Sequence, residues 1–274
     1  MPDLPKISIV TPSYNQGEFI EATIRSVLDQ NYPNLEYIVM DGGSTDGSVD
    51  IIKKYANRLT HWESHPDKGQ ADAIYRGFER ATGEILGWVN SDDLLISGCL
   101  DKTRRYFATH PEEEWVVGGT ILIDRKGGYV PNSRGNPRCN LGGRIKFHRL
   151  LFSGCGFNQP ASFWRRETFF DVGGFDRSLR FCFDYDLYFR LAQRRPSGNI
   201  RDFLACFRKH PASKSNTIQN IRDAENELLR HKYGRYQKSE LYRKSVAMWY
   251  ITFGLVKARI IQIKLILGFL KIPL

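Results

Sequence analysis

The apolar residues of the first hundred positions alternate between two spacings. Short runs rich in β-branched and aromatic residues are typical of strands, and the stretches between them place an apolar residue every three or four positions, as on one face of a helix. The runs predict strands at residues 7–10, 36–40, 60–63 and 84–90, and the stretches between them predict helices at residues 19–30, 48–55 and 71–81. This alternation, in units of about 25–30 residues, predicts a parallel sheet with right-handed crossovers.

The second half of the chain has a less regular pattern. A stretch rich in Gly, Arg and Asn at residues 118–156 predicts mainly loop. Around it, apolar runs predict strands at residues 115–117, 120–124, 163–165 and 204–209, and helical spacing predicts helices at residues 184–194 and from 220 onward. We therefore expect an α/β domain over residues 1–215, with a mostly parallel sheet flanked by helices, and a helical region over residues 216–274.

Composition and charge narrow the classes of protein. The chain has 274 residues, of which 41% are apolar and 26% charged, as in a globular protein with a sizeable core. The net charge is +10, and residues 228–274 carry +9 of it, with ten basic residues and one acid. Because the body is nearly neutral, a nucleic-acid reader with a basic face on the folded domain is disfavoured, and we expect no nucleic-acid partner.

The cysteines and the N-terminal residues indicate in which cellular compartment the protein is found. The five cysteines are widely spaced and form no C-x-x-C pair, which predicts free thiols in a reducing compartment rather than a disulfide framework or a zinc site. The first residues lack the basic and apolar regions of a signal peptide. These features predict a cytoplasmic protein.

The C-terminal stretch has the pattern of an amphipathic helix. Residues 245–256 carry no charge, and Lys257, Lys264 and Lys271 then recur every seven residues, so that they share one helical face. With Trp249 as an interface anchor, this pattern predicts a helix lying in the plane of an anionic membrane, at the inner face of the cell membrane. The alternative is a helix packed on the domain or in a dimer.

Polar segments follow three of the predicted strands. They lie at residues 11–15, 41–47 and 90–93. Since ligands of open parallel sheets bind beyond the carboxyl ends of the strands, these segments are expected to form one site. No G-x-G-x-x-G or G-x-x-x-x-G-K-[ST] loop follows the first strand, which excludes the usual dinucleotide and P-loop sites.

Asp92 and Asp93 are the most informative pair in these segments. Two adjacent carboxylates at the end of a buried strand are costly unless a cation compensates them, and oxygen ligands of this kind suit Mg²⁺ or Mn²⁺. The alternative is that they cap the helix beginning near Ser97. Asp46 could likewise cap the helix at residue 48, whereas Asp41 has no capping position.

Four motifs in this order resemble glycosyltransferase family 2, which has the GT-A fold. They are Ile-Val-Thr-Pro-Ser-Tyr-Asn at residues 9–15, Val-Met-Asp-Gly-Gly-Ser-Thr-Asp-Gly-Ser at 39–48, Val-Asn-Ser-Asp-Asp at 89–93, and Gly-Gly-Phe-Asp at 173–176 followed by Phe-Asp-Tyr-Asp-Leu at 183–187. The resemblance covers roughly residues 5–215. It implies transfer of a sugar from a nucleotide-sugar donor, with a UDP-sugar as the first choice.

The resemblance also implies a metal-binding role for part of the site. Asp93 is expected to ligate Mg²⁺ or Mn²⁺, which would neutralise charge developing on the diphosphate, with Asp92 nearer the ribose or donor sugar. His210 follows the last strand and could reach the metal or the diphosphate; the alternative is a structural histidine.

Nucleotide contacts are assigned by the same resemblance. Asp41 is expected to accept hydrogen bonds from the nucleoside, and Tyr14 to stack on the base. The full set expected to bind the nucleotide is Thr11, Pro12, Tyr14, Asp41, Lys68, Gln70 and Asp92. Arg76, on the same helix as Gln70, could belong to it or could simply face solvent.

Inversion at the anomeric carbon requires a carboxylate that takes the proton of the acceptor hydroxyl. Asp184 is the residue that the motif implies, and Asp186 is the second choice; a helix N-cap is the alternative role for Asp184. Asn158 and Gln159 could meet the acceptor.

Three positions depart from the pattern of the family. Relatives often carry a second acid where this chain has Gly42, Glu-Asp where it has Phe183-Asp184, and Arg-Asn where it has residues 74–75. The first departure affects which nucleobase is bound, the second affects which carboxylate acts as the general base, and the third affects how the diphosphate is held.

Together these features predict an inverting, metal-dependent glycosyltransferase that acts on a hydroxyl of a polysaccharide or lipid-linked acceptor in cell-surface glycan assembly. A sugar-nucleotide pyrophosphorylase is a rival, but residues 11–17 hold no Arg or Lys for its phosphate loop. A non-catalytic nucleotide- or lipid-binding protein that keeps the GT-A fold is the other rival.

Overall fold

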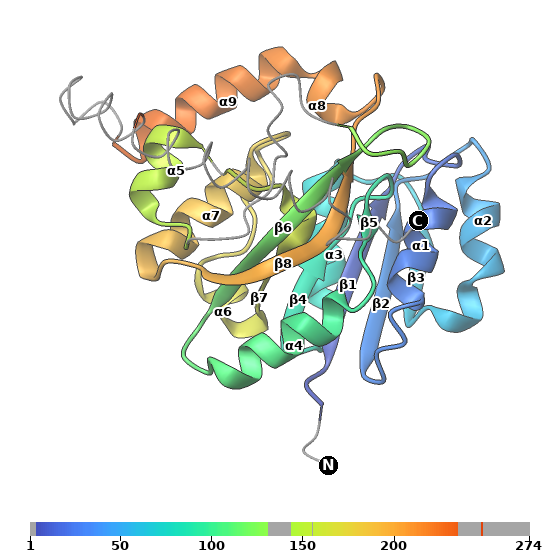
Figure 1. The fold of residues 1–274 in the computed structure, drawn as a ribbon. Coiled ribbons are helices and arrows are strands. Elements are labelled where there is room, and N and C mark those ends of the chain that lie inside the picture. Colours follow the sequence, from blue (N-terminus) through green and yellow to red (C-terminus); the bar gives the residue numbers. More distant parts are fainter. Residues whose placement is uncertain (1–3, 131–143, 155, 235–247, 249–274) are drawn as a thin grey trace.

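The computed structural model describes residues 4–130, 144–154, 156–234 and 248, and the predicted amphipathic helix lies outside these residues. An eight-stranded sheet runs through the molecule with helices on both faces (Figure 1). The strands are β1 (Ile7–Ser13), β2 (Leu35–Asp41), β3 (His61–Ser64), β4 (Ile85–Trp88), β5 (Leu94–Leu95), β6 (Trp115–Ile123), β7 (Ser162–Arg165) and β8 (Gly198–Arg208).

The described residues also form nine α-helices and two short 3₁₀ helices, of which α8 and α9 follow the last strand. The α-helices are α1 (Ile20–Leu28), α2 (Ser48–Lys54), α3 (Gln70–Arg80), α4 (Cys99–Thr109), α5 (Phe147–Ser153), α6 (Arg166–Asp171), α7 (Phe183–Arg194), α8 (Lys214–Thr217) and α9 (Gln219–Lys232). The 3₁₀ helices are η1 (Ala56–Arg58) and η2 (Gln159–Ala161).

The sheet has the strand order β3-β2-β1-β4-β7-β6-β8-β5. The first four strands are parallel to one another, as the βα alternation predicts. Strand β7 runs antiparallel to both β4 and β6, and the two-residue β5 runs antiparallel to β8. The mostly parallel α/β sheet expected from the sequence is confirmed, with two antiparallel insertions.

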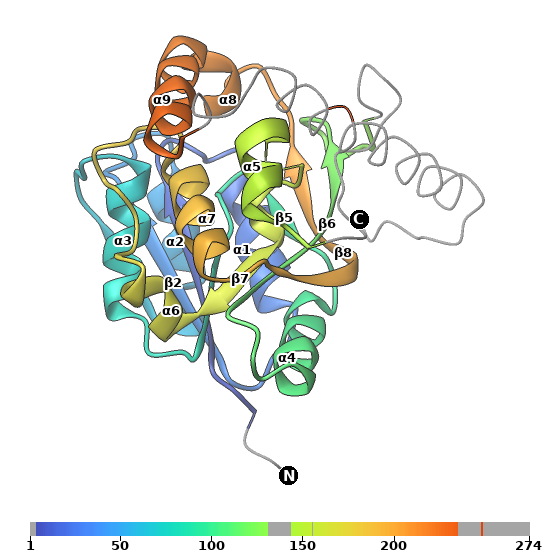
Figure 2. The ribbon, with the colours of Figure 1, turned by 90° about the vertical axis from the view of Figure 1, so that its left-hand side faces the viewer.

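Side chains alternate between two apolar layers, one on each face of the sheet. Along β1, Val10 joins the layer that includes α3 and α7, whereas Ile9 joins the layer that includes α1 and α4. Figure 2 shows these helices on opposite sides of the sheet. Because both faces are covered, β1, β2 and β4 are buried along almost their whole length and are rich in apolar residues, whereas β3, at the edge of the sheet, is only half-buried.

Three α-helices of the described residues were not predicted from the sequence. Helix α5 lies in the Gly-rich stretch predicted as loop, α6 follows β7 directly, and α8 precedes the helix predicted from residue 220 onward. All three have seven residues or fewer, too few for helical periodicity to be recognised.

Helix α9 packs on the α/β domain beside α5 and α7 (Figure 1). Its Leu229 is fully buried and belongs to the same apolar layer as α3 and α7. The boundary expected between residues 215 and 216 falls inside α8. Among the helices of the described residues, none is long and apolar enough to cross a membrane.

Adjacent leucines on α9 provide a test of this packing. Leu229→Ala should lower the free energy of unfolding by about 2–5 kcal/mol, because it leaves a cavity in the apolar layer. Leu228 is 55% exposed, so Leu228→Ala should change stability by less than about 0.5 kcal/mol. Urea unfolding of the full chain measures both values, and equal small effects would mean that α9 does not belong to the folded unit.

Candidate active site

The carboxyl ends of the first three strands meet at one edge of the sheet. Ser13 of β1 lies in register with Asp41 of β2, which in turn lies in register with Ser64 of β3. Asn90 follows the end of the neighbouring β4. The polar segments that follow these strands in the sequence therefore gather at one edge, as predicted.

Asp41 is buried at this edge and organises the loop that follows it. One carboxylate oxygen accepts hydrogen bonds from the backbone amides of Gly43 and Ser44, at 3.1 and 2.9 Å, and from the Ser64 hydroxyl at 2.7 Å. The other accepts from the Ser44 hydroxyl at 2.5 Å. Asp41 thus holds the second polar segment in place, and its contact with a nucleoside remains a prediction.

The first polar segment presents its residues differently. Thr11 and Pro12 are buried in β1, and the Thr11 hydroxyl pairs with that of Tyr37 at 3.0 Å. Tyr14 is 63% exposed, so its ring is available for stacking. The buried Ser13 hydroxyl has no hydrogen-bond partner among the described residues.

Asp67 is a site residue that sequence reasoning missed. A Cβ atom added at Gly42 would lie 2.8 Å from the Asp67 carboxylate and 3.4 Å from the Tyr14 ring. An acidic group therefore stands beside Tyr14 although position 42 has no side chain. Asp67 lies just after the carboxyl end of β3, and that position was the available signal.

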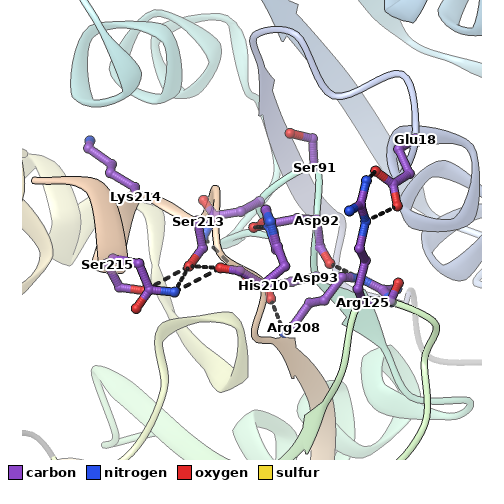
Figure 3. A network of polar contacts seen from close by, with 12 residues as sticks. Glu18, Ser91, Asp92, Asp93, Arg125, Arg208, His210, Ser213, Lys214 and Ser215 are labelled. Atoms are coloured by element: carbon purple, nitrogen blue, oxygen red, sulfur yellow. Dashed lines mark hydrogen bonds and ion pairs between the residues drawn. The ribbon is translucent and has the colours of Figure 1, made fainter.

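Asp92 and His210 lie side by side at the ends of β4 and β8 (Figure 3). The His210 Nε2 atom is 3.1 Å from the Asp92 Oδ2 atom, and the imidazole packs against Phe19, with 4.7 Å between ring centroids. The His210 side chain is 4% exposed and that of Asp92 is 19% exposed. A carboxylate oxygen and an imidazole nitrogen thus meet where β8 and the β4 turn join.

Asp93 points away from this pair, into the protein. Its Oδ1 atom accepts the backbone amide of Arg208 at 2.8 Å, and its Oδ2 atom accepts the Asn90 side-chain amide at 3.3 Å. Burial, and then the neighbouring charge of Asp92, raise the pKa of Asp93 well above its ordinary value. Asp93 was the residue expected to ligate the metal; the geometry favours Asp92 for that contact.

Asn90 connects this turn to the rest of the site. Its side chain accepts a hydrogen bond from Gln70 at 2.7 Å and from the Trp88 indole at 3.2 Å. Gln70 in turn accepts from the Lys214 ammonium of α8, at 2.7 Å. Lys68 lies just before Gln70 and is exposed. Gln70 therefore links the β4 end to α8, whereas the Lys68 side chain projects into solvent.

Asp184 is half-buried in the first turn of α7. Burial raises its pKa to about 6, although the Tyr185 amide, at 2.7 Å, and the charge of Lys214 act in the opposite direction. Burial lowers the pKa of Lys214 to about 8, so the two groups sit in the same water-poor region. A carboxylate with a pKa near 6 is ionised at neutral pH and basic enough to accept a proton.

Asp186, the second choice for the base, is a structural residue. It is 1% exposed, and it is paired with Arg190 and with Lys232 of α9, both at 2.8 Å. Burial alone would raise its pKa, but hydrogen bonds from Lys232 and Tyr233 and the charge of Arg190 hold the pKa below the ordinary value. A carboxylate held in this way is a poor proton acceptor.

The remaining candidates take part in buried or paired contacts. The Asn158 amide donates to the Thr120 hydroxyl at 2.8 Å, and that of Gln159 donates to the Trp88 carbonyl at 2.9 Å. Arg76 is ion-paired with Glu63 of β3. Contacts of these residues with an acceptor or a nucleotide stay predictions.

Among the described residues, no group of three His, Cys, Asp or Glu side chains could hold a metal ion. Asp92 and His210 offer an oxygen and a nitrogen donor at one point, a donor set that Mn²⁺ accepts. Mg²⁺ and Mn²⁺ sites in phosphate-transferring proteins commonly use few protein ligands and complete their coordination with phosphate oxygens and water. The residues present therefore fit a metal that arrives with a diphosphate.

Comparison with known proteins gives a family. The sequence model described as "Glycosyl transferase family 2" matches residues 8–173, which is more than half of the chain. An uncharacterized glycosyltransferase of Rickettsia felis is 26% identical over 82% of this chain, which spans 37% of that relative's length. The "putative teichuronic acid biosynthesis glycosyltransferase TuaG" of Bacillus subtilis is 40% identical over 36% of this chain and 40% of its own.

Two solved structures share the fold. TarS of S. aureus in complex with UDP-GlcNAc has a TM-score of 0.66 at 17% identity, over 90% of this chain and 71% of its own. The mannosyltransferase PcManGT of Pyrobaculum calidifontis, in complex with GDP-Man and Mn²⁺, has a TM-score of 0.63 at 19% identity, over 94% of this chain and 74% of its own. These are GT-A structures, which confirms the fold expected from the sequence.

Substitutions of Asp184 and Asp186 should change the free energy of unfolding in opposite directions. Because the pKa of Asp184 is raised from 3.8 to about 6, the cost of ionising its carboxylate in the folded protein grows as the pH rises between these two values and is fully present above about 6. Asp184→Asn should therefore stabilise the protein at pH 7.5, and the gain should shrink as the pH falls from 6 towards 4. Asp186→Asn should cost about 3–5 kcal/mol at pH 7.5, because it leaves buried cations without their carboxylate.

The stability that Asp186 supplies is present above its unfolded-state pKa and is lost as the pH falls through its lower folded-state pKa. Urea unfolding of the two variants and the parent chain between pH 4.5 and 8 separates these effects. A loss of stability in Asp184→Asn that matches the loss in Asp186→Asn would contradict the assignment.

Proposed function

The chain belongs to glycosyltransferase family 2, and from that membership and the geometry of the site we propose that it transfers a sugar from a nucleotide-sugar to an acceptor hydroxyl with inversion and with the help of a divalent metal. The observation that carries this proposal is a series of polar contacts between side chains across the site. It runs from Lys214, which lies near Asp184, through Gln70 to Asn90 and so to the turn that holds Asp92. A basic carboxylate and a candidate metal ligand are therefore parts of one connected polar site.

Asp92 and His210 would hold the metal. The ion, when bound, would neutralise the charge that develops on the leaving diphosphate. Asp93 supports this arrangement from inside the protein, because its bond to the Arg208 amide fixes the β4 turn to the strand that carries His210. Tyr14, Asp67 and the buried Ser13 hydroxyl offer stacking and polar contacts for the nucleoside at the neighbouring strand ends.

Asp184 would act as the general base. Inversion in one step needs a single carboxylate that takes the hydroxyl proton while the acceptor oxygen attacks the anomeric carbon opposite the diphosphate. The raised pKa of about 6 matches that task near neutral pH. Lys214, whose pKa is lowered to about 8, keeps a positive charge beside this carboxylate at neutral pH.

The donor and acceptor are proposed from the relatives' names. The neighbours in complex with UDP-GlcNAc and GDP-Man support a nucleotide-sugar donor. The TuaG name refers to teichuronic acid biosynthesis, which supports a glycan acceptor for this chain. The basic, apolar residues beyond 245 support peripheral contact with the inner face of the cell membrane, where a lipid-linked acceptor would be found.

Thermal unfolding with nucleotides tests the metal site and the base separately. UDP, GDP, dTDP and CDP are each added with Mn²⁺ or with EDTA. One nucleotide at about a hundred times its Kd should stabilise the parent chain by roughly 2.7 kcal/mol, and only with metal. Asp92→Asn and His210→Ala should each abolish the metal-dependent shift, because each removes a metal ligand.

Asp184→Asn is the matched variant, since it alters a carboxylate of the same site without touching the metal ligands. It should keep the shift but lose turnover of the matching nucleotide-sugar by a factor of about 10² or more. A shift that survives in Asp92→Asn and His210→Ala would refute the metal site, and full turnover by Asp184→Asn would refute the base.

A further inference from the structure

Glu225 of α9 binds the backbone just before α7. Its carboxylate accepts three consecutive backbone amides, those of Arg180 at 2.6 Å and of Phe181 and Cys182 at 2.8 Å. Glu225 is half-buried, and no ion pair with it is found in the part of the chain that the structure describes. The carboxylate is therefore committed to these amides, although it lies more than forty residues further along the chain.

These three amides belong to the segment that sets where α7 begins. Cys182 is the N-cap residue of α7, and its carbonyl accepts the first helical hydrogen bond, from the Asp186 amide at 2.9 Å. Its side chain makes no capping bond to the helix. The helix start is thus held by a side chain from another helix, and Asp184 is the second residue after it.

Further contacts fix α9 on α7 about two turns beyond Glu225. Lys232 and Tyr233 both donate to the Asp186 Oδ1 atom, at 2.8 and 2.7 Å. Leu229, between them and Glu225 on α9, is fully buried. The carboxylate of Glu225 is therefore presented from a rigid helix and not from a loop.

We propose that Glu225 is a positioning residue for the transfer reaction, which holds the start of α7 so that the Asp184 carboxylate meets the acceptor hydroxyl. This inference rests on the proposed role of Asp184 as the base. Proton transfer depends steeply on the distance between the two heavy atoms, and a displacement of about 1 Å costs on the order of a hundredfold in rate. Three charge-assisted bonds are a strong constraint on such a displacement.

Substitution by glutamine removes this constraint with little change in volume. In Glu225→Gln one oxygen is replaced by an NH₂ group, which cannot accept an amide hydrogen. The start of α7 should then loosen and admit water to Asp184. The matched control is Asp223→Asn, on the same helix, because Asp223 is exposed and its carboxylate pairs only locally with Arg222.

The first readout needs no substrate. The charged or titratable neighbours of Asp184 are Lys214 on α8, Glu225 on α9 and the thiol of Cys182, whose pKa burial raises so far that it stays neutral. The pH-dependent difference in stability between the parent chain and Asp184→Asn is measured again in the Glu225→Gln background, as a double-mutant cycle. Its midpoint should fall, because Glu225→Gln both removes a negative charge that raises the pKa of Asp184 and loosens the start of α7. It should stay unchanged in the Asp223→Asn background.

The second readout is turnover of the nucleotide-sugar matching the nucleotide that stabilises the chain, UDP-GlcNAc and GDP-mannose being the first tested. Glu225→Gln should lower kcat by about tenfold to a hundredfold and leave the metal-dependent nucleotide shift intact. If Glu225 acted on Asp184 through its charge alone, the midpoint would move and kcat would be unchanged. If Glu225 were merely structural, its effect would add to that of Asp184→Asn at every pH and kcat would again be unchanged; either result overturns the proposal.

The two hypotheses fail in different ways. If Asp184→Asn keeps full turnover, the assignment of the base is wrong, and the positioning role falls with it. If Asp184→Asn loses turnover while Glu225→Gln keeps both kcat and the midpoint, only the positioning role is wrong. Should Glu225→Gln fail to fold, Glu225→Asp, which is one methylene too short to reach all three amides, takes its place in both readouts.

Discussion

The site depends on how the structure accommodates two adjacent carboxylates at the end of a buried strand. A buried carboxylate must receive hydrogen bonds, and Asp93 receives them from Asn90 and from the backbone amide of Arg208 on β8. Its neighbour Asp92 then faces the opposite way, towards His210. The hydrogen bond that the buried Asp93 carboxylate needs thus connects the turn after β4 to β8. This connection places the Asp92 carboxylate next to the His210 imidazole. The candidate metal ligands are consequences of this arrangement.

The second half of the site depends on helix packing. Asp184 and Asp186 are two residues apart in the first turn of α7, yet burial raises the pKa of one while the partners from α9 keep that of the other low. Elements that follow β8 contribute to both environments: Lys214 of α8 partly offsets the effect of burial on the pKa of Asp184, and Lys232 of α9 pairs with Asp186. The described part of the C-terminal region is thus part of the environment of the candidate base.

The sequence predicts the parallel half of the sheet well, since β1, β2 and β4 are rich in apolar residues and helices lie between the strands. It also brings the polar segments to the correct edge. It does not distinguish Asp92 from Asp93, because which way each faces is decided by β8, more than a hundred residues away. Asp67 and Glu225 lie outside any recognised motif, and only the packing of β3 and α9 shows what they contact.

The most direct test of the central claim is an anomalous diffraction measurement on crystals grown with Mn²⁺ and the nucleotide that stabilises the chain. The account predicts an anomalous peak bonded to the Asp92 carboxylate and the His210 Nε2 atom, with the diphosphate completing the coordination. A peak bonded to other side chains, or nucleotide bound at the strand ends with no metal between it and Asp92, would contradict the account.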